Sequence, residues 1–155
     1  MSIHIGDTAP DFTLFNTEKQ AISLSSYHGK NVVVLFFPLA FTSTCTAELC
    51  GVRDDISNYG KMDAEVLAIS VDSLFALGKF KEEQGLNFNL LSDFNKTASQ
   101  AYDSLYDTFV LEMKGVSKRS AFLIDRDGVI RYAEVLESAG DVPNLEALKE
   151  ILKTL

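Results

Sequence analysis

The feature that most constrains the fold is the run NVVVLFF (Asn31–Phe37), which consists almost wholly of β-branched and aromatic side chains. Such a run is typical of a strand that is buried on both faces of a sheet. Pro38 follows directly and ends the strand, because proline has no N–H to donate to a sheet ladder. A second buried run, EVLAISVD (Glu65–Asp72), predicts another strand of the same kind.

The other predicted elements alternate between strands and helices, with turn and cap signals between them. In chain order we expect a hairpin of Phe12–Phe15 with Ala21–Leu24, the strand Asn31–Phe37, a helix from Ser43 to about Tyr59, the strand Glu65–Asp72, a helix over Ser73–Gly85, a strand at Phe88–Asp93, a helix at Asn95–Leu105, a hairpin of Arg119–Asp125 with Gly128–Leu136, and a helix over Asn144–Leu155. This order predicts an α/β fold with a mixed central sheet and helices on both faces. It is the order of a thioredoxin-like fold, with the N-terminal hairpin as an addition.

The length and composition favour one domain. The chain has 155 residues, 46% of them hydrophobic, which supports one well-buried core and is too short for two comfortable domains. We therefore expect a single domain over residues 1–155. The opening MSIHIGDTAPDF has no basic region followed by an apolar one, so we expect no signal peptide. No apolar run approaches the roughly 20 residues that cross a bilayer, and we expect a cytoplasmic protein.

The charge and the histidine content exclude several classes of partner. A formal net charge of −8 argues against nucleic acid and against anionic membranes, because both require a basic footprint. It is compatible with an enzyme that acts on small molecules. His4 and His28 are far in sequence from the cysteines, and no C-x-x-C pair is present to complete a tetrahedral site. We therefore expect no metal and no cofactor.

The two cysteines of the chain, Cys45 and Cys50, both lie in the stretch PLAFTSTCTAELC. Cys45 falls in the first turn of the predicted helix, directly after a buried strand, where open α/β sheets bind their ligands. Unpaired backbone N–H groups and the positive end of the helix dipole favour a thiolate there. The alternative is an inert cysteine that packs as a small hydrophobe. The hydroxyl-rich turn TST and the helix start favour the reactive cysteine.

The spacing of the two cysteines restricts what they can do together. On an intact helix, residues five positions apart have Cα atoms roughly 8–9 Å from each other. A disulfide without backbone movement requires less than ~7 Å. Cys45 and Cys50 therefore cannot bond while the helix is intact. Either Cys50 is simply a core residue, or the first helical turns unwind so that the two sulfurs can meet.

PLAFTSTC resembles the P-x-x-x-T-x-x-C signature of the peroxiredoxins, the thiol peroxidases, at Pro38, Thr42 and Cys45. Arg119 in RSAFLID matches the arginine that opens a later strand in that family. CTAELCGVRD resembles the bacterioferritin-comigratory (Q-type) subfamily, whose second cysteine stands five residues after the first. PLAFT also resembles the AhpE-type subfamily, which lacks a cysteine at that place. The likeness covers essentially the whole chain.

The resemblance implies a peroxidase that reduces hydrogen peroxide and small organic hydroperoxides. Cys45 would attack one peroxide oxygen and become a sulfenic acid. Arg119 would favour the thiolate and hold the peroxide with its fork of donors. The hydroxyl of Thr42 can donate and accept, so it would orient the peroxide, although a threonine there could also be an ordinary helix cap. The N–H groups of Thr44 and Cys45 would add donors.

Two further residues have roles that the same resemblance implies. Pro38 would shield the thiolate and shape the loop without offering a competing N–H. Glu48 occupies a position where the family often has a carboxylate or amide that anchors the arginine. The alternative for Glu48 is a solvated residue on the helix surface.

Two roles stay open for Cys50. In a Q-type protein it attacks the sulfenic acid after the helix start unwinds, and thioredoxin or a similar thiol reductant reduces the disulfide. In an AhpE-type protein it is a bystander, and an external thiol reduces Cys45 directly. With no cysteine after Cys50, we expect no resolving cysteine from a partner subunit, and we expect a monomer or a homodimer.

Two other functions remain as alternatives. A thioredoxin-like dithiol oxidoreductase is disfavoured because the chain has no C-x-x-C pair. A non-enzymatic redox-sensing module, which would use the unwinding as its signal, is disfavoured because the sequence supplies no dedicated partner surface.

Overall fold

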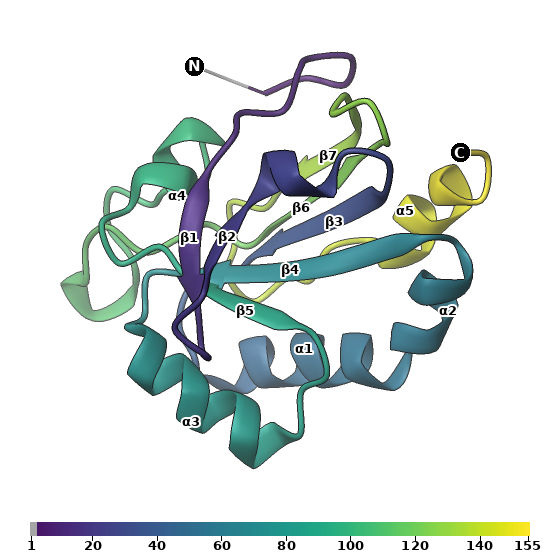
Figure 1. The fold of residues 1–155 in the computed structure, drawn as a ribbon. Helices are drawn as coiled ribbons and strands as arrows, with labels where there is room; N and C mark the ends of the chain where they lie inside the picture. The colour runs from purple at the N-terminus through teal and green to yellow at the C-terminus, as the bar shows by residue number, and fades with distance from the viewer. Residues whose placement is uncertain (1–2) are drawn as a thin grey trace.

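The computed structural model describes residues 3–155, whose strands form one seven-stranded sheet in the order β2-β1-β5-β4-β3-β6-β7 (Figure 1). The elements are β1 (Thr13–Asn16), β2 (Ala21–Ser23), the 3-10 helix η1 (Leu24–Tyr27), β3 (Asn31–Phe36), α1 (Ser43–Asp54), α2 (Ile56–Lys61), β4 (Ala64–Ser70), α3 (Leu74–Gln84), β5 (Asn89–Ser92), α4 (Thr97–Ala101), the 3-10 helix η2 (Val110–Glu112), β6 (Ser120–Ile124), β7 (Ile130–Val135) and α5 (Leu145–Leu152).

The sheet is mixed. Strand β4 runs parallel to both β3 and β5, whereas β6 is antiparallel to β3 and to β7. The N-terminal hairpin is continuous with this sheet, because β1 pairs antiparallel with β5. The predicted thioredoxin-like arrangement, a mixed sheet flanked by helices, is confirmed.

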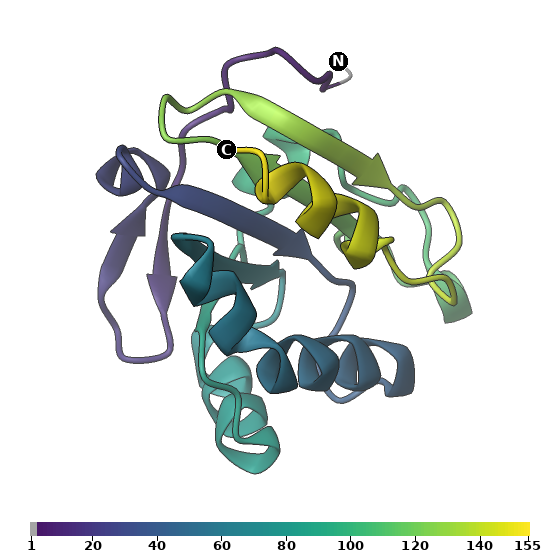
Figure 2. The same cartoon turned by 90° about the vertical axis from the view of Figure 1, so that its right-hand side faces the viewer.

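Strand β3 is buried along its whole length because its side chains enter two separate cores. Val33 and Leu35 belong to the cluster that packs under α1, α2, α3 and α5. Val32 and Val34 belong to the cluster on the opposite face, under η1 and α4. Successive side chains of a strand point to opposite faces, so a continuous apolar run is what a two-sided core requires. Figure 2 shows α5, in yellow, lying against the green hairpin of β6 and β7.

The predicted helix from Ser43 to Tyr59 is wrong in one respect, because it is two helices that break at Asp55. The Asp55 carboxylate accepts hydrogen bonds from Asn58 and, at 2.6 Å, from Lys149 of α5. These contacts tie the break to a helix far along the chain, which no local pattern could reveal. The redirected α2 then places Tyr59, 1% exposed, in the core.

The predicted helix at Asn95–Leu105 is also shorter than expected, since α4 covers only Thr97–Ala101. Its first turn is capped by Asp93, whose carboxylate accepts from the N–H groups of Ala98 and Ser99 at 3.1 and 2.7 Å. The chain then leaves the helix so that the Tyr102 ring can enter the second core cluster.

Helix α3 has the caps that the sequence predicts. Ser73 accepts from the N–H of Ala76 at 3.2 Å, and Gly85 follows the last helical residue with a φ of 61°. That left-handed conformation favours glycine, because any Cβ strains it.

We expect Gly85→Ala to lower the free energy of unfolding by about 1 kcal/mol, because alanine resists the left-handed conformation. Gly60→Ala is the matched control. Gly60 lies within α2 and an added Cβ there meets nothing within 4 Å, so this substitution should raise stability by about 0.5–1 kcal/mol. Urea unfolding of the reduced proteins measures both values. A Gly85→Ala variant as stable as the parent would contradict the assignment of this cap.

Candidate functional site

The site forms where the chain leaves β3 and enters α1. Sheet pairing continues to Phe37, whose N–H donates to Ile69 of β4 at 3.0 Å, and the buried Pro38 then starts a short loop. Asp72 holds this loop in place, since its carboxylate accepts from the N–H of Ala40 at 2.8 Å. The sequence prediction included Asp72 only as the end of a strand. Its position directly after a strand parallel to β3 was the signal that could have revealed its role.

Cys45 lies in the first turn of α1 with its side chain fully buried. The first helical hydrogen bond runs from the N–H of Thr46 to the carbonyl of Thr42 at 2.9 Å. Within residues 3–155, no group accepts a hydrogen bond from the N–H of Thr44 or Cys45, and no acidic side chain occupies the first turn. Both N–H groups can therefore donate to an anion or to a polarised oxygen at the sulfur.

Arg119 comes from the residue before β6 and reaches the same sulfur. Its side chain is only 2% exposed, and Nη2 lies 3.2 Å from Cys45 Sγ. Nη1 donates to Glu48 Oε1 at 2.7 Å, while Nε and Nη2 donate to the carbonyl of Ala139 at 3.2 and 3.0 Å. Burial by itself lowers the pKa of Arg119, but the neighbouring Cys45 and Glu48 outweigh it and raise that pKa, so the guanidinium keeps its charge.

Glu48 lies one turn after Cys45 on α1, and its side chain is only 2% exposed. Burial raises the pKa of Glu48 to about 7, against the opposing attraction of Arg119. Its second oxygen, Oε2, accepts no hydrogen bond from the residues that the structure describes, so the pair with Arg119 is held at one point. Glu48 also lines a groove of about 450 Å³ between α1 and the start of α5. It is not the solvated surface residue that the sequence left open.

Thr42 precedes the first residue of α1, but its side chain makes no capping hydrogen bond. Its hydroxyl instead donates to the carbonyl of Leu39 at 2.8 Å. The hydroxyl proton is thereby committed, and the lone pairs of the oxygen remain free to accept. Thr42 can therefore receive a proton-bearing group of a bound molecule rather than donate to it.

Phe41 adopts an unusual backbone conformation in the same loop. Its φ is 70°, a left-handed value that strains a bulky residue, and its ring contacts Phe80 of α3 with centroids 5.1 Å apart. Strain of this kind is often found where a loop presents reactive groups. Phe41 was not among the predicted site residues, because no local pattern indicates a left-handed phenylalanine.

Cys50 lies on another flank of α1 from Cys45. It is half-buried, it packs against the core cluster under α1, and its Sγ lies 3.5 Å from Gln84 Oε1 at the end of α3. Both cysteines are free thiols on one continuous helix. The site therefore brings Cys45, Glu48 and Arg119 together and leaves Cys50 outside.

The loop that supplies the Ala139 carbonyl is supported by Tyr106. The Tyr106 hydroxyl lies within hydrogen-bond distance of the carbonyls of Leu136 and Glu137, at 3.2 and 3.1 Å. Phe109 stacks on its ring with centroids 5.4 Å apart. This aromatic pair holds the segment that meets the guanidinium.

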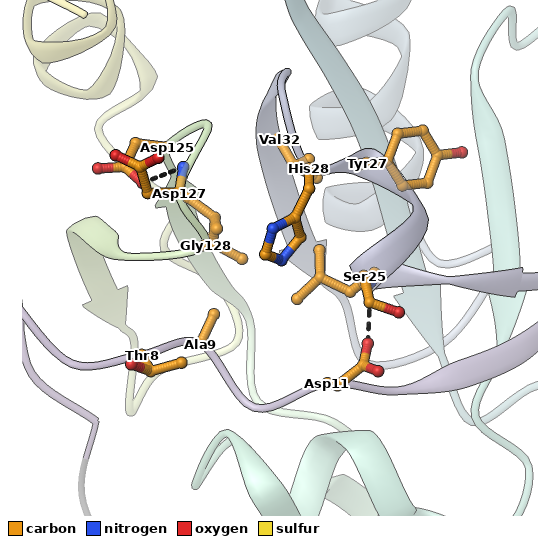
Figure 3. A pocket seen from close by; sticks show the side chains of 12 residues that line it. Thr8, Ala9, Asp11, Ser25, Tyr27, His28, Val32, Asp125, Asp127 and Gly128 are labelled. Atoms are coloured by element: carbon orange, nitrogen blue, oxygen red, sulfur yellow. Dashed lines mark hydrogen bonds between the residues drawn. The ribbon is translucent and has the colours of Figure 1, made fainter.

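A second, smaller hollow of about 70 Å³ lies at the other end of β3, near Val32 and Ile124 (Figure 3). Figure 3 shows the His28 ring directed toward Gly128, and Asp11 accepting from the N–H of Ser25 at 2.9 Å. Asp125 is engaged in the turn, where it accepts from the N–H groups of Asp127 and Val129. The polar groups of this hollow thus close turns, and none of the candidate site residues reaches it.

Residues 3–155 contain neither a metal-binding cluster nor a membrane-spanning helix. No group of three or more histidine, cysteine, aspartate or glutamate side chains in this range is arranged to hold a metal ion. None of the helices in the same range is both long and apolar enough to cross a membrane.

Comparison with known proteins gives consistent matches. The model of the AhpC/TSA family matches residues 5–133. Alkyl hydroperoxide reductase E of Mycobacterium tuberculosis (strain ATCC 25618 / H37Rv) is 38% identical over 99% of this chain and 98% of its own. Peroxiredoxin Bcp of Bacillus subtilis (strain 168) is 39% identical over 83% of this chain and 82% of its own. Among solved structures, peroxidoxin BcpB of Mycobacterium tuberculosis has a TM-score of 0.85 at 28% identity, with 97% of each chain covered.

Titration of Glu48 should appear in the stability of the reduced protein. Its folded pKa of about 7 lies above the ordinary 4.5, so the folded state keeps a proton that the unfolded state has lost. The resulting stabilisation is fully present below pH 4.5 and disappears as the pH rises through about 7. We expect the free energy of unfolding of the parent to fall across this window, relative to Glu48→Gln, by on the order of a few kcal/mol.

Urea unfolding at a series of pH values measures this difference. Glu65→Gln, which removes a half-exposed carboxylate paired with Lys30, is the control and should leave the pH dependence unchanged. Parallel curves for the parent and Glu48→Gln would show that Glu48 does not titrate in this window.

Proposed function

The chain belongs to the AhpC/TSA family of peroxiredoxins and is a thiol peroxidase, and we propose that it reduces hydrogen peroxide and small organic hydroperoxides with Cys45 as the nucleophile. The observation that carries this assignment is the 3.2 Å contact between Arg119 Nη2 and Cys45 Sγ, in a site where the Arg119 side chain is only 2% exposed. A buried arginine that faces a buried cysteine is a cationic partner for the thiolate. Because both side chains are buried, water screens their attraction little.

In the first step the Cys45 thiolate attacks the terminal oxygen of the peroxide. A sulfur–oxygen bond forms, the oxygen–oxygen bond breaks, and Cys45 becomes a sulfenic acid. The other oxygen leaves with the bonding electron pair and takes a proton, so it departs as water or as an alcohol. The sulfur loses two electrons, and the peroxide gains them.

Each neighbouring group has a part in this step. Arg119 and the free N–H groups of Thr44 and Cys45 donate to the oxygens, on which negative charge develops as the bond breaks. Thr42 accepts the hydrogen bond of the peroxide hydroxyl, because its own proton is committed to Leu39. Pro38, which is buried at the start of the site loop, would shield the thiolate and adds no donor that would compete.

Glu48 acts through Arg119. The plane of the guanidinium is fixed by two partners. Glu48 contacts Nη1, and the Ala139 carbonyl contacts Nε and Nη2, so that Nη2 faces the sulfur. Glu48 is therefore a positioning residue, and the four site residues that the peroxide meets are Thr42, Thr44, Cys45 and Arg119.

In the second step we assign the resolving role to Cys50. Its thiolate attacks the sulfenic sulfur, a disulfide forms, and hydroxide leaves to be protonated to water. Both cysteines lie on the continuous helix α1, so its first turns must unwind before this step. The likeness to a Bcp peroxiredoxin, together with the spacing of five residues, supports this assignment.

A second candidate is a one-cysteine peroxidase in which an external thiol reduces Cys45 directly. The half-buried position of Cys50 beside Gln84 and the likeness to alkyl hydroperoxide reductase E favour it. The two candidates share the first step and differ only in what removes the sulfenic acid.

The family implies a peroxide substrate and a thiol reductant. We propose thioredoxin or a similar dithiol protein as the reductant of the Cys45–Cys50 disulfide. We also propose that residues 1–155 act as one thioredoxin-like domain, as a monomer or a homodimer, and in the cytoplasm.

Arg119→Lys tests the first step, because lysine keeps the charge but loses the planar fork that meets Cys45, Glu48 and Ala139 together. We expect the rate constant for oxidation of Cys45 by hydrogen peroxide to fall by about 10²–10³. Stopped-flow kinetics measures it, with Arg126→Lys, at a half-exposed pair with Asp63, as an unaffected control. A parent rate no faster than that of free cysteine would refute the peroxidase assignment.

Cys50→Ser tests the second step. After a slight excess of peroxide, we expect the mass of the parent to show the loss of two hydrogens, because the disulfide has formed. The variant should instead gain one oxygen and react with a sulfenic acid trap such as dimedone. Intact-protein mass spectrometry reads both products. If the parent also accumulates the trapped sulfenic acid, Cys50 is a bystander and the one-cysteine mechanism holds.

A further inference from the structure

The thiol of Cys50 is not freely presented to Cys45, because it faces the C-terminal end of α3. Its Sγ lies 3.5 Å from Gln84 Oε1, which is within range for a hydrogen bond from a thiol. Cys50 also packs against the core cluster under α1, so the residue lies between apolar side chains and the Gln84 amide. A thiol in this position must part from that amide before it can attack another sulfur.

Gln84 is itself held beside Cys50 by Arg53, which lies on α1 together with Cys50. The carbonyl of Gln84 accepts from Arg53 Nη1 at 2.5 Å, and the carbonyl of Arg53 accepts from Asn87 at 3.4 Å. Gln84 is the last residue of α3, and its carbonyl has no partner within the helix. A cation is favoured at such a helix end. Arg53 therefore fixes the end of α3 against α1, one turn beyond Cys50.

We propose that the Gln84 side chain covers the Cys50 thiol and slows its attack on the Cys45 sulfenic acid. This inference rests on the proposed function and concerns its second step. Two thiols compete for the sulfenic sulfur: Cys50, and an external thiol from a small molecule or a reductant protein. Either one forms a disulfide with Cys45 and releases hydroxide, which is protonated to water. By delaying Cys50, Gln84 sets how much of the sulfenic acid the external thiol captures.

Gln84 is a positioning residue, because it touches neither the peroxide nor Cys45. Among residues 3–155, its hydrogen bonds to other helices go to Cys50 and, through its carbonyl, to Arg53. Changes of its side chain should therefore alter the second step and leave the first step unchanged. A residue with a merely structural role would instead affect both steps through the stability of α1.

The direct test uses a background of Cys45→Ser, in which Cys50 is the single thiol. We expect Gln84→Ala to raise the rate of alkylation of Cys50 by iodoacetamide by about 2–10-fold, the effect of losing one hydrogen bond. Gln84→Met, which keeps the length of the side chain but not the amide, should lie between Gln84→Ala and the parent. Glu83→Ala, at the adjacent residue of α3, should leave the rate unchanged.

The second measurement uses the otherwise native protein. After one equivalent of peroxide, we expect Gln84→Ala to convert sulfenic acid to disulfide faster by a similar factor, with the rate of sulfenic acid formation unchanged. Added external thiol should then capture a smaller share of the sulfenic acid than it does in the parent. Urea unfolding checks that the variants remain folded.

The outcomes separate the two proposals. An alkylation rate that Gln84→Ala leaves unchanged overturns the covering role of Gln84, whatever Cys50 does. An accelerated alkylation supports the covering role, and the absence of any disulfide after peroxide would then overturn only the resolving role of Cys50.

Discussion

The site depends on the hydrogen bonds of the Arg119 guanidinium. This guanidinium joins three parts of the chain that are distant in sequence: Cys45 and Glu48 on α1, the start of β6, and the carbonyl of Ala139 in the loop after β7. A buried arginine is costly unless its donors are satisfied, and here each nitrogen has a partner. The cost of burying the charge is offset only when all three segments are in place. The reactive geometry is thus a property of the folded sheet and helices rather than of the loop around Cys45.

This arrangement conflicts with the chemistry of the second cysteine. In the proposed mechanism, peroxide reduction requires an intact helix start, since the N–H groups of Thr44 and Cys45 and the contact with Arg119 all depend on it. A disulfide with Cys50 requires the same turns to unwind. In the proposed cycle one segment therefore has two conformations, and each excludes the chemistry of the other. The strained backbone of Phe41 and the one-point contact of Glu48 lie in or beside this segment.

Local patterns in the sequence predicted much of this structure. The continuous apolar run of Asn31–Phe37 indicated the two-sided core, and the caps of α3 followed from Ser73 and Gly85. Cys45 was identified from its place at a helix start after a buried strand, whereas Arg119 was identified because a resemblance paired it with that distant residue. No periodicity or propensity could have supplied that pairing.

The features that sequence analysis missed depend on contacts between distant segments. Asp72 supports the site loop because β4 lies parallel to β3, and Asp55, at the break between α1 and α2, is contacted by Lys149 of the distant α5. Ala139 takes part through its backbone carbonyl, so the identity of its side chain gives no indication of this role. The contact of Gln84 with Cys50 likewise needs the packing of α3 on α1.

The position of Glu48 on α1 has a consequence for the reductant. Glu48 lies between the two cysteines in the chain, so an unwinding that joins their sulfurs withdraws its carboxylate from Arg119. In the proposed cycle, the disulfide form contains a buried arginine without its carboxylate partner, and reduction restores the pair when the helix reforms. Folding energy is thereby linked to electron transfer, because whatever favours the Arg119–Glu48 pair also favours the dithiol over the disulfide. In that cycle, the reductant donates its electrons to a chain that regains a helix turn and the Arg119–Glu48 contact by accepting them.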